Sequence, residues 1–445
     1  KMFFSILLCV ILVITVMYHF QDEEEEDYTK YPELVGQIAS VGDETLLIRL
    51  SDNTEYLISI AGVIDKNKGL LTGNTISIRY EGKLDKEYKD IQDIKVKKYQ
   101  VTEKKIGNYK KAYVNQELSN IIQNMSLEEK IAQMFLVRCP DNNQEEFVKN
   151  FKPGGYLLFA KDFEDLSKEE VIHKIENYQK KSKIKMFIGV DEEGGSVVRI
   201  SQYLRSTRFQ SPQMIYSQGG YENIKEDTKE KNQFLKQFGI NLNLAPVCDI
   251  STNSDDFMYS RSFGKDASET GKYVQTVVKQ MNEDLMGGCL KHFPGYGNNN
   301  DSHYNVVHDT RSYKSIKEND LIPFQKGIEE NANMILVCHN IIDNIDKTLP
   351  ASLSKKVHHI LRNDMTYNGI IITDDLVMEG VKKLDSNENN AIKAVAAGND
   401  MLISSDAYAQ YQTIVDAVKN NQISENQIDQ SVLRILYYKQ QLQII

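Results

Sequence analysis

Short apolar runs alternate with amphipathic stretches through residues 117–445. Helical periodicity appears at residues 168–181 and 223–238, and Ser126 followed by Glu129 is the capping-box pattern that opens a helix. Runs typical of buried strands lie at residues 135–138, 155–159, 186–190, 242–247, 287–290, 333–338, 369–373 and 400–404. Eight strands that alternate with helices predict an α/β fold of the (β/α)8 TIM-barrel class.

An open, doubly wound sheet is the alternative fold for this part of the chain. Its first strand should be followed by a glycine-rich turn that binds phosphate. The nearest candidate, Gly295-Tyr296-Gly297-Asn298-Asn299-Asn300, lacks the third glycine of that pattern. The closed barrel is therefore the favoured prediction.

Residues 32–101 follow the shorter, alternating period of β-strands. The strand candidates are residues 35–41, 45–50, 55–60, 74–80 and 91–96, with turn residues such as Gly42-Asp43 and Asp52-Asn53 between them. This pattern predicts a small all-β domain of the OB or SH3-like barrel kind. An OB fold could bind oligosaccharide or nucleic acid, but we interpret the domain as a spacer or accessory unit. A charged linker at residues 102–116 joins it to the predicted barrel.

The N-terminal residues 2–20 (MFFSILLCVILVITVMYHF) are almost continuously apolar and long enough to span a bilayer as a helix. Lys1 precedes them and an acidic linker, residues 22–31, follows, so the charges favour an inside N-terminus and an outside body. We therefore expect residues 1–21 to anchor a single-pass protein in the cell membrane. Secretion after signal-peptide cleavage is the alternative, although His19-Phe20-Gln21 does not resemble a cleavage site.

Composition narrows the range of partners. The 445 residues are 41% hydrophobic and 26% charged, which is typical of globular proteins, and the formal net charge is −10. An acidic chain without clustered Lys and Arg argues against nucleic acid as a partner and leaves an uncharged, polar substrate as the simpler expectation. We expect a monomer.

The five cysteines share no close spacing. Most lie in or beside apolar runs, which indicates buried small hydrophobes rather than a zinc site or a disulfide framework. The spacing of Asp301, His303 and His308 also fits no common zinc pattern, so we expect neither a metal nor a cofactor. No Gly-x-Ser-x-Gly elbow of a serine hydrolase is present.

Polar side chains gather where the predicted strands end. In a barrel of this class the carboxyl ends of the strands carry the functional residues. Five of the endings have charged or hydrogen-bonding side chains: Asp191-Glu192-Glu193, Cys248-Asp249, Lys291-His292, His339-Asn340 and Asp374-Asp375. One such ending could be a helix cap, but the set together indicates a site.

The polar residues in this set suit the chemistry of a glycosidic bond. That chemistry needs one group to attack the anomeric carbon and another to protonate the leaving oxygen. Asp374, which ends an apolar strand, is the candidate nucleophile, and we interpret its neighbour Asp375 as a helix cap or supporting acceptor. His303 is the candidate acid/base, because Asp301 two residues earlier can orient its imidazole.

Several segments resemble family 3 glycoside hydrolases, specifically the β-N-acetylglucosaminidase branch. The resemblance runs from about Met125 to the C-terminus. It rests on Asp191-Glu192-Glu193-Gly194-Gly195 with Val198-Arg199, Asn243-Leu244-Ala245-Pro246-Val247-Cys248-Asp249, Arg261-Ser262-Phe263-Gly264, Lys291-His292-Phe293-Pro294-Gly295, Asp301-Ser302-His303, Leu349-Pro350-Ala351-Ser352-Leu353-Ser354 and Thr373-Asp374-Asp375-Leu376-Val377-Met378.

The resemblance implies a role for each matching residue. Asp374 would form a glycosyl-enzyme intermediate, and His303 with Asp301 would replace the usual second carboxylate as acid/base. The positions implied to hold the hydroxyl groups of the non-reducing-end sugar are Asp191, Arg261, Lys291 and His292. The implied activity is a retaining exo-β-N-acetylglucosaminidase that acts on cell-wall glycan fragments.

Three departures from the family pattern bear on the leaving-group side of the substrate. Tyr296 stands where His is frequent, Ser196 where Arg is common, and Asn298-Asn299-Asn300 precedes Asp301. Two other functions stay open from the sequence. A histidine acid/base also suits a phosphorylase, because it would not repel an incoming phosphate, and a degenerate barrel could be a non-catalytic surface protein that binds glycan.

Overall fold

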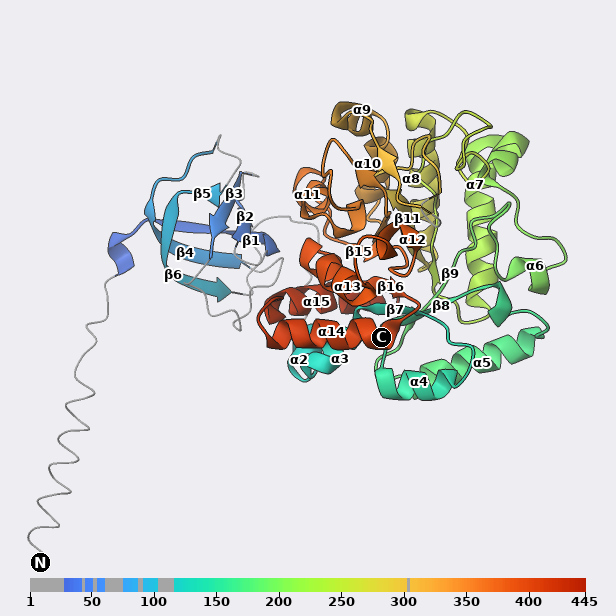
Figure 1. Cartoon of the computed structure of the whole chain (residues 1–445), viewed down its shortest axis with the longest axis horizontal. Helices are drawn as coiled ribbons and strands as arrows, with labels where there is room; N and C mark the ends of the chain where they lie inside the picture. The colour runs from blue at the N-terminus through green and yellow to red at the C-terminus, as the bar shows by residue number, and fades with distance from the viewer. Residues whose placement is uncertain are drawn as a thin grey trace, which may run out of the picture. The chain divides into compact units, whose positions relative to one another are not determined.

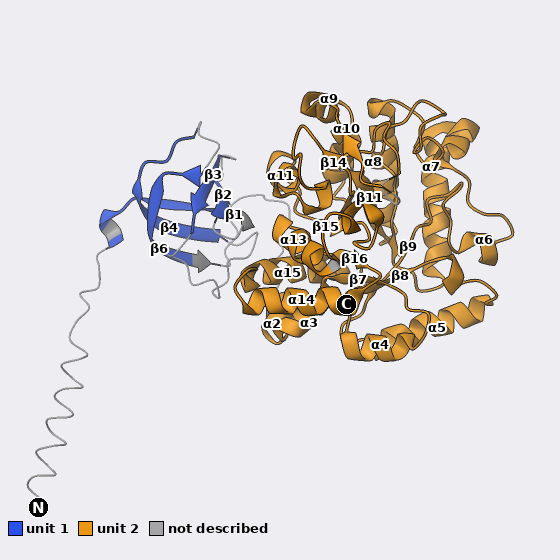
Figure 2. Cartoon of the chain, viewed as in Figure 1, with its two compact units in different colours: residues 1–39, 44–110 blue, residues 40–43, 111–445 orange. Residues whose placement is uncertain are grey.

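The computed structural model describes residues 28–41, 45–50, 54–60, 75–86, 91–102, 116–301 and 305–445. Contacts within the chain divide it into two compact units, drawn in different colours in Figure 2. Residues 1–39 and 44–110 belong to the first unit, and residues 40–43 and 111–445 to the second. Each unit is described by itself.

The first unit is a six-stranded sheet in the order β5-β3-β2-β1-β4-β6. It has one strand more than predicted, because residues 91–96 contribute to both β5 and β6. Its elements are η1 (Tyr28–Lys30), β1 (Glu33–Val41), β2 (Thr45–Arg49), β3 (Glu55–Ser59), β4 (Thr75–Gly82), β5 (Ile91–Gln92) and β6 (Ile94–Thr102). Side chains along a strand alternate between the two faces of the sheet, and the inward-facing Ile58 in β3 and Ile76 and Ile78 in β4 are completely buried. No strand pairing among the described residues joins β5 to β6, so closure into a barrel stays a prediction.

The second unit is built around an eight-stranded parallel sheet in the order β15-β13-β11-β10-β9-β8-β7-β16. A parallel bridge between Ile372 and Met401 joins β15 to β16 and closes the sheet into a barrel. The strands are β7 (Phe135–Arg138), β8 (Gly155–Leu158), β9 (Phe187–Val190), β10 (Leu242–Asn243), β11 (Gly287–Phe293), β13 (Met334–Val337), β15 (Ile370–Thr373) and β16 (Leu402–Ser404). All eight predicted strands are confirmed, and the doubly wound alternative is wrong because the Ile372–Met401 bridge joins the two ends of the sheet.

Helices surround the barrel and connect its strands (Figure 1). The longer ones are α2 (Gln116–Gln123), α4 (Gln144–Phe151), α5 (Lys168–Lys181), α7 (Pro212–Lys236), α8 (Ala267–Glu283), α10 (Leu321–Glu329), α13 (Asn387–Ala397), α14 (Ala407–Lys419) and α15 (Glu425–Gln441). The shorter elements are α3 (Leu127–Gln133), η2 (Ala160–Asp162), α6 (Ser201–Leu204), α9 (Tyr313–Glu318), η3 (Ala351–Leu353), α11 (Lys355–His359), η4 (Ile360–Asp364) and α12 (Glu379–Lys382). A two-stranded parallel sheet pairs β12 (His308–Asp309) with β14 (Ile341–Ile342).

Local sequence signals account for several of these boundaries. The Ser126 hydroxyl accepts from the Glu129 amide at 3.2 Å and the Glu129 carboxylate accepts from the Ser126 amide at 3.4 Å, so the predicted capping box is confirmed. The predicted helix at residues 168–181 is α5, with the same bounds. The helix predicted at residues 223–238 is the second part of α7, whose helical geometry is interrupted at Gly219 and Gly220.

Two predictions concern the N-terminus and the cysteines. The predicted anchor, residues 1–21, and Cys9 lie outside the described residues. In the part of the chain that the structure describes, none of the helices combines the length and apolar character needed to cross a bilayer. The other cysteines, Cys139, Cys248, Cys289 and Cys338, are buried and unbridged, as predicted.

Candidate active site

Hydrogen bonds between neighbouring strands place the ends of β11, β13 and β15 at one level of the barrel. The Asp374 amide donates to the Val337 carbonyl at 3.3 Å, and the Cys338 amide donates to the Phe293 carbonyl at 2.9 Å. Asp374, the first residue after β15, therefore lies on the same rim as the end of β11 and two strands away from it. This rim, at the carboxyl ends of the strands, is called the barrel mouth below.

A buried ion network occupies the mouth between β9 and β11. Lys291 Nζ lies 2.7 Å from Asp191 Oδ1 and 2.6 Å from Glu193 Oε1, and only 2% of the Lys291 side chain is exposed. Arg261 binds Glu193 through two contacts, Nη2 to Oε1 at 2.7 Å and Nε to Oε2 at 3.0 Å. The four side chains come from three segments that are far apart in the sequence, so only the barrel brings them together.

The ion-pair partners of Lys291 and Glu193 keep both side chains charged despite their burial. Burial opposes the charged form of Lys291, yet Asp191 and Glu193 hold its pKa above the ordinary value. Burial likewise disfavours the Glu193 carboxylate, but Lys291 and Arg261 more than offset this effect and hold its pKa well below the usual range. At neutral pH the mouth thus presents fixed charges, which suit hydrogen bonding to the hydroxyl groups of a polar ligand.

A second arginine extends the network towards β7 and β8. Arg199 Nη2 lies 3.4 Å from Asp191 Oδ2, and its guanidinium carbon lies 5.3 Å from the centre of the Phe159 ring. Arg138 at the end of β7 contacts the same ring at 4.4 Å. Two cations therefore share one aromatic side chain beside Asp191.

His292 is oriented by a buried carboxylate. Asp249 Oδ2 lies 2.7 Å from His292 Nδ1 and also accepts from the His292 amide at 3.1 Å. The other ring nitrogen, Nε2, lies 3.4 Å from Arg261 Nη2. The Tyr296 ring packs edge-on against the imidazole, and the Tyr296 amide donates to Asp249 Oδ1 at 2.8 Å. Asp249 thus connects the predicted sugar-binding histidine to the chain that leads to Asp301.

The two carboxylates after β15 have different surroundings. Asp374 is partly accessible, and its Oδ1 accepts from the Asp375 amide at 2.8 Å. Asp375 accepts from the Val377 amide at 3.2 Å and from both the hydroxyl and the amide of Ser405. The interpretation of Asp375 as a supporting acceptor is confirmed, but its prediction as a cap is wrong, because α12 begins at Glu379 rather than at residue 376.

The predicted acid/base pair is described only in part. Asp301 is partly accessible, whereas His303 lies outside the described residues, so its role stays a prediction. His308 is exposed, and its Nδ1 lies 2.8 Å from Asp343 Oδ1. Among the described residues, no group of three or more His, Cys, Asp or Glu side chains is arranged to hold a metal ion.

Two residues outside the predicted set belong to the candidate site, namely Glu193 and Asp249. Both lie in strand-end segments that the sequence had already marked as polar. What the sequence could not show is which carboxylate of Asp191-Glu192-Glu193 faces the mouth. Glu192 instead accepts from the Arg199 and Ile200 amides, at 2.8 and 3.0 Å, and so holds a turn.

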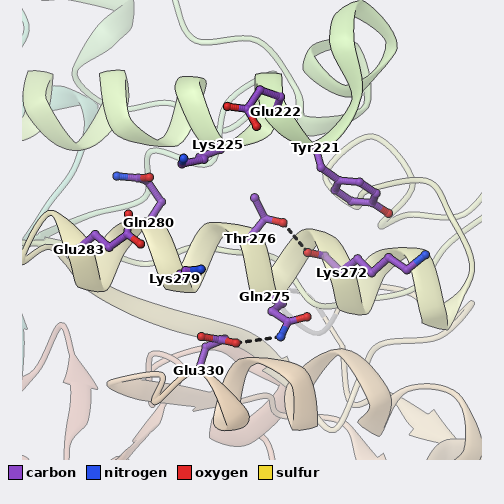
Figure 3. Close-up of a pocket in the computed structure, with 10 residues that line it drawn as sticks. All are labelled: Tyr221, Glu222, Lys225, Lys272, Gln275, Thr276, Lys279, Gln280, Glu283 and Glu330. Atoms are coloured by element: carbon purple, nitrogen blue, oxygen red, sulfur yellow. Dashed lines mark hydrogen bonds between the residues drawn. The ribbon is translucent and has the colours of Figure 1, made fainter.

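A separate groove lies between helices α7 and α8 on the outside of the barrel (Figure 3). It has a volume of about 460 Å³ and is lined largely by charged side chains, including Lys225, Lys272 and Glu330. The Gln275 side-chain amide donates to Glu330 Oε1 at 2.8 Å (Figure 3). None of the residues that line it belongs to the network at the mouth.

Comparison with known families matches residues 126–438 to the glycosyl hydrolase family 3 N-terminal domain. The chain belongs to glycosyl hydrolase family 3. The match covers the barrel and includes every predicted site residue, from Asp191 to Asp374. The resemblance inferred from the sequence is thereby confirmed.

Individual family 3 relatives agree with this assignment. A β-hexosaminidase of Photobacterium profundum is 30% identical over 264 residues, which cover 58% of this chain and 77% of the relative. β-Hexosaminidase A of Pseudoalteromonas piscicida is 26% identical over 328 residues, 67% of this chain, and the match spans about half (55%) of that relative. A solved family 3 β-N-acetylglucosaminidase from Paenibacillus sp. FPU-7 superposes with a TM-score of 0.68 at 25% identity, covering 72% of this chain and 63% of that one.

Proposed function

We propose that this family 3 chain hydrolyses terminal β-linked N-acetylglucosamine as a retaining exo-glycosidase. The observation that carries the proposal is the ion network of Asp191, Lys291, Glu193 and Arg261, which lies on the same rim as Asp374. Such a network can hold the hydroxyl groups of one terminal sugar while the carboxylate lies at its anomeric carbon. The relatives named β-hexosaminidase support the choice of sugar.

The proposed reaction has two displacement steps. An Asp374 oxygen attacks the anomeric carbon as the glycosidic C–O bond breaks, and His303 gives its proton to the departing oxygen. Water then attacks the anomeric carbon of the glycosyl-enzyme, and the same imidazole accepts the proton as the Asp374 carboxylate is released. Asp301 would orient the imidazole, and the network at the mouth would hold the sugar through both steps.

The natural substrate is proposed to be a cell-wall glycan fragment with a non-reducing-end N-acetylglucosamine. Support comes from the family assignment and from the name of the Paenibacillus structure. Because the network is buried and each of its charges is paired, it favours a neutral terminal sugar over one that carries its own charge.

A panel of aryl β-glycosides tests this proposal. The expected result is p-nitrophenol release from the N-acetyl-β-glucosaminide at a kcat/KM at least about tenfold above that for the β-glucoside, since the lost acetamido contacts are worth roughly that factor. NMR should show the β-anomer of free N-acetylglucosamine as the first product. Formation of a sugar 1-phosphate in phosphate buffer would instead identify a phosphorylase, and inertness towards every aryl glycoside would revive the glycan-binding function.

We also propose that residues 1–21 anchor the chain in the cell membrane with the barrel outside. The proposal rests on the apolar run at residues 2–20 and the acidic residues that follow it. Expression of the full chain should leave it in the membrane pellet after carbonate washing, and protease added to intact cells should degrade the barrel. Recovery in the culture medium with residues 1–21 removed would support secretion instead.

A further inference from the structure

Arg311 lies between two buried carboxylates beside the mouth. Its Nη2 lies 2.7 Å from Asp309 Oδ2, and its Nη1 lies 2.8 and 2.9 Å from the two oxygens of Asp320. Asp309 is fully buried, and Asp320 is 4% exposed. A planar guanidinium can bind two carboxylates at once, whereas a lysine ammonium cannot reproduce this geometry.

The same arginine holds the chain where it leaves β11. Arg311 Nη2 donates to the Gly295 carbonyl at 3.2 Å. Gly297 packs so closely on the guanidinium that a Cβ there would lie 2.4 Å from Arg311 Cζ, and a Cβ on Gly295 would lie 2.6 Å from Asp320 Oδ1. The two glycines of Gly295-Tyr296-Gly297 thus allow the outgoing chain to lie directly against the ion cluster.

The returning chain is fixed at the same place. Asp309 belongs to β12, whose pairing with β14 is supported by hydrogen bonds from the Ile341 amide to the Val307 carbonyl at 2.8 Å and from the Asp343 amide to the Asp309 carbonyl at 2.9 Å. Arg311 therefore ties together the residues on both sides of segment 298–306. That segment contains Asp301 and the predicted acid/base His303.

We infer that Arg311 is a positioning residue for the proton-transfer step, because it holds together the described residues on both sides of segment 298–306, which carries Asp301 and the predicted acid/base His303. The inference rests on the proposed function. Holding the ends of a segment together has an entropic cost that the ion cluster offsets, and a displacement of about 1 Å in a reacting group can cost about a hundredfold in rate. Arg311 itself need not touch the substrate.

The dependence of kcat/KM on the leaving group distinguishes a residue that positions the acid/base from one that only stabilises the fold. A substrate with a poor leaving group, such as an N-acetylglucosamine disaccharide, needs protonation in the first step, whereas a 2,4-dinitrophenyl glycoside does not. For Arg311→Gln we expect kcat/KM on the disaccharide to fall about ten- to hundredfold and kcat/KM on the dinitrophenyl glycoside to change less than about threefold. With the dinitrophenyl substrate, kcat should fall and recover when azide replaces water as the nucleophile.

Two further variants keep the test decisive. Asp320→Asn leaves Asp309 as the one carboxylate that binds Arg311. This variant should show the same selective loss of kcat/KM on the disaccharide, smaller in size, and it can be measured even if Arg311→Gln does not fold. Arg362→Gln is the matched control, because Arg362 is also half-buried and bridges segments, contacting the Gly369 carbonyl at 2.7 Å and Asp400 at the opposite ends of the strands. It should lower the melting temperature without changing the ratio of the two kcat/KM values.

The outcomes are distinct. Equal loss on both substrates in Arg311→Gln and Asp320→Asn, as in the Arg362→Gln control, would overturn the positioning role. His303→Ala provides the benchmark: selective loss there, without selective loss in the Arg311 and Asp320 variants, would also overturn it. A wild-type chain that cleaves neither N-acetylglucosaminide would instead overturn the proposed function on which the inference rests.

Discussion

Two buried lysines at opposite ends of the same barrel have opposite electrostatic settings. Lys291 at the mouth contacts two carboxylates and keeps its charge. Lys439 from α15 lies at the base, where its Nζ donates to Gln133 Oε1 at 2.8 Å and lies 5.3 Å from the centre of the Phe187 ring, with no carboxylate in contact among the described residues. Burial alone lowers the pKa of Lys439 to about 7.

The comparison shows that burial does not by itself decide whether a lysine is charged. At the mouth, the chain keeps a set of desolvated charges that the fold does not need, because a well-packed apolar cluster of similar volume would be at least as stable. Such an arrangement is typical of sites that bind or react. At the base, a single lysine without an anion contributes to packing. Substitutions at the mouth should therefore change activity most, and those at the base should change stability and its pH dependence.

The largest effect is expected at the mouth from Asp374→Asn. Loss of the nucleophile should reduce kcat for p-nitrophenyl N-acetyl-β-glucosaminide by at least about a thousandfold, as expected for a group that forms the intermediate. The neighbouring variant Asp375→Asn is the control and should lose less activity, because that side chain supports Val377 and Ser405. Near-normal turnover by Asp374→Asn would refute the nucleophile assignment.

Lys291→Met tests the charged lysine directly. It leaves Asp191 and Glu193 desolvated without their shared cation, so we expect a loss of about 3–5 kcal/mol in the free energy of unfolding and at least about a hundredfold loss in kcat/KM. Urea denaturation and steady-state kinetics measure the two effects. Lys439→Met makes the same substitution at the base and is the matched control. If both variants lose similar activity, the expectation that the mouth determines activity and the base determines stability is wrong.

Asp249→Asn should give an intermediate effect. The amide retains one oxygen, so it cannot accept from His292 Nδ1 and the Tyr296 amide as the carboxylate does. Misorientation of the imidazole should lower kcat/KM about ten- to hundredfold while kcat changes less, since the histidine holds the sugar. Unchanged kcat/KM would mean that His292 is a structural histidine and not a ligand of the sugar.

The smallest effect on activity is expected from Lys439→Met, within about twofold of wild type, but its stability should respond to pH. Above about pH 7 the folded wild type releases the Lys439 proton, whereas the unfolded chain keeps it until about pH 10.5, so this group makes stability rise with pH across that window by up to about 1.4 kcal/mol per unit. Unfolding free energies of both proteins, measured from pH 6 to 10, should show this slope in their difference. A constant difference would show that Lys439 titrates normally.

Elements with strong local signals were predictable from the sequence. Short apolar runs such as Met334–Val337 in β13 are buried at every position, as strands of a parallel barrel are, and this pattern can be recognised without knowledge of the neighbouring strands. The boundaries failed where packing overrides local preference. The prediction of Asp375 as a helix cap is wrong because its carboxylate accepts from the Ser405 amide after β16, and α12 begins only at Glu379.

The sequence by itself determined that this chain forms an eight-stranded barrel of family 3 and that polar residues lie at its strand ends, since periodicity and short motifs depend only on neighbours along the chain. The tertiary structure alone decided the pairing of those residues. Lys291 meets Asp191 across 100 positions, and Asp249 meets His292 across 43. The charge of a buried group depends on the distance to its partners and on desolvation, and both are set only when the barrel closes.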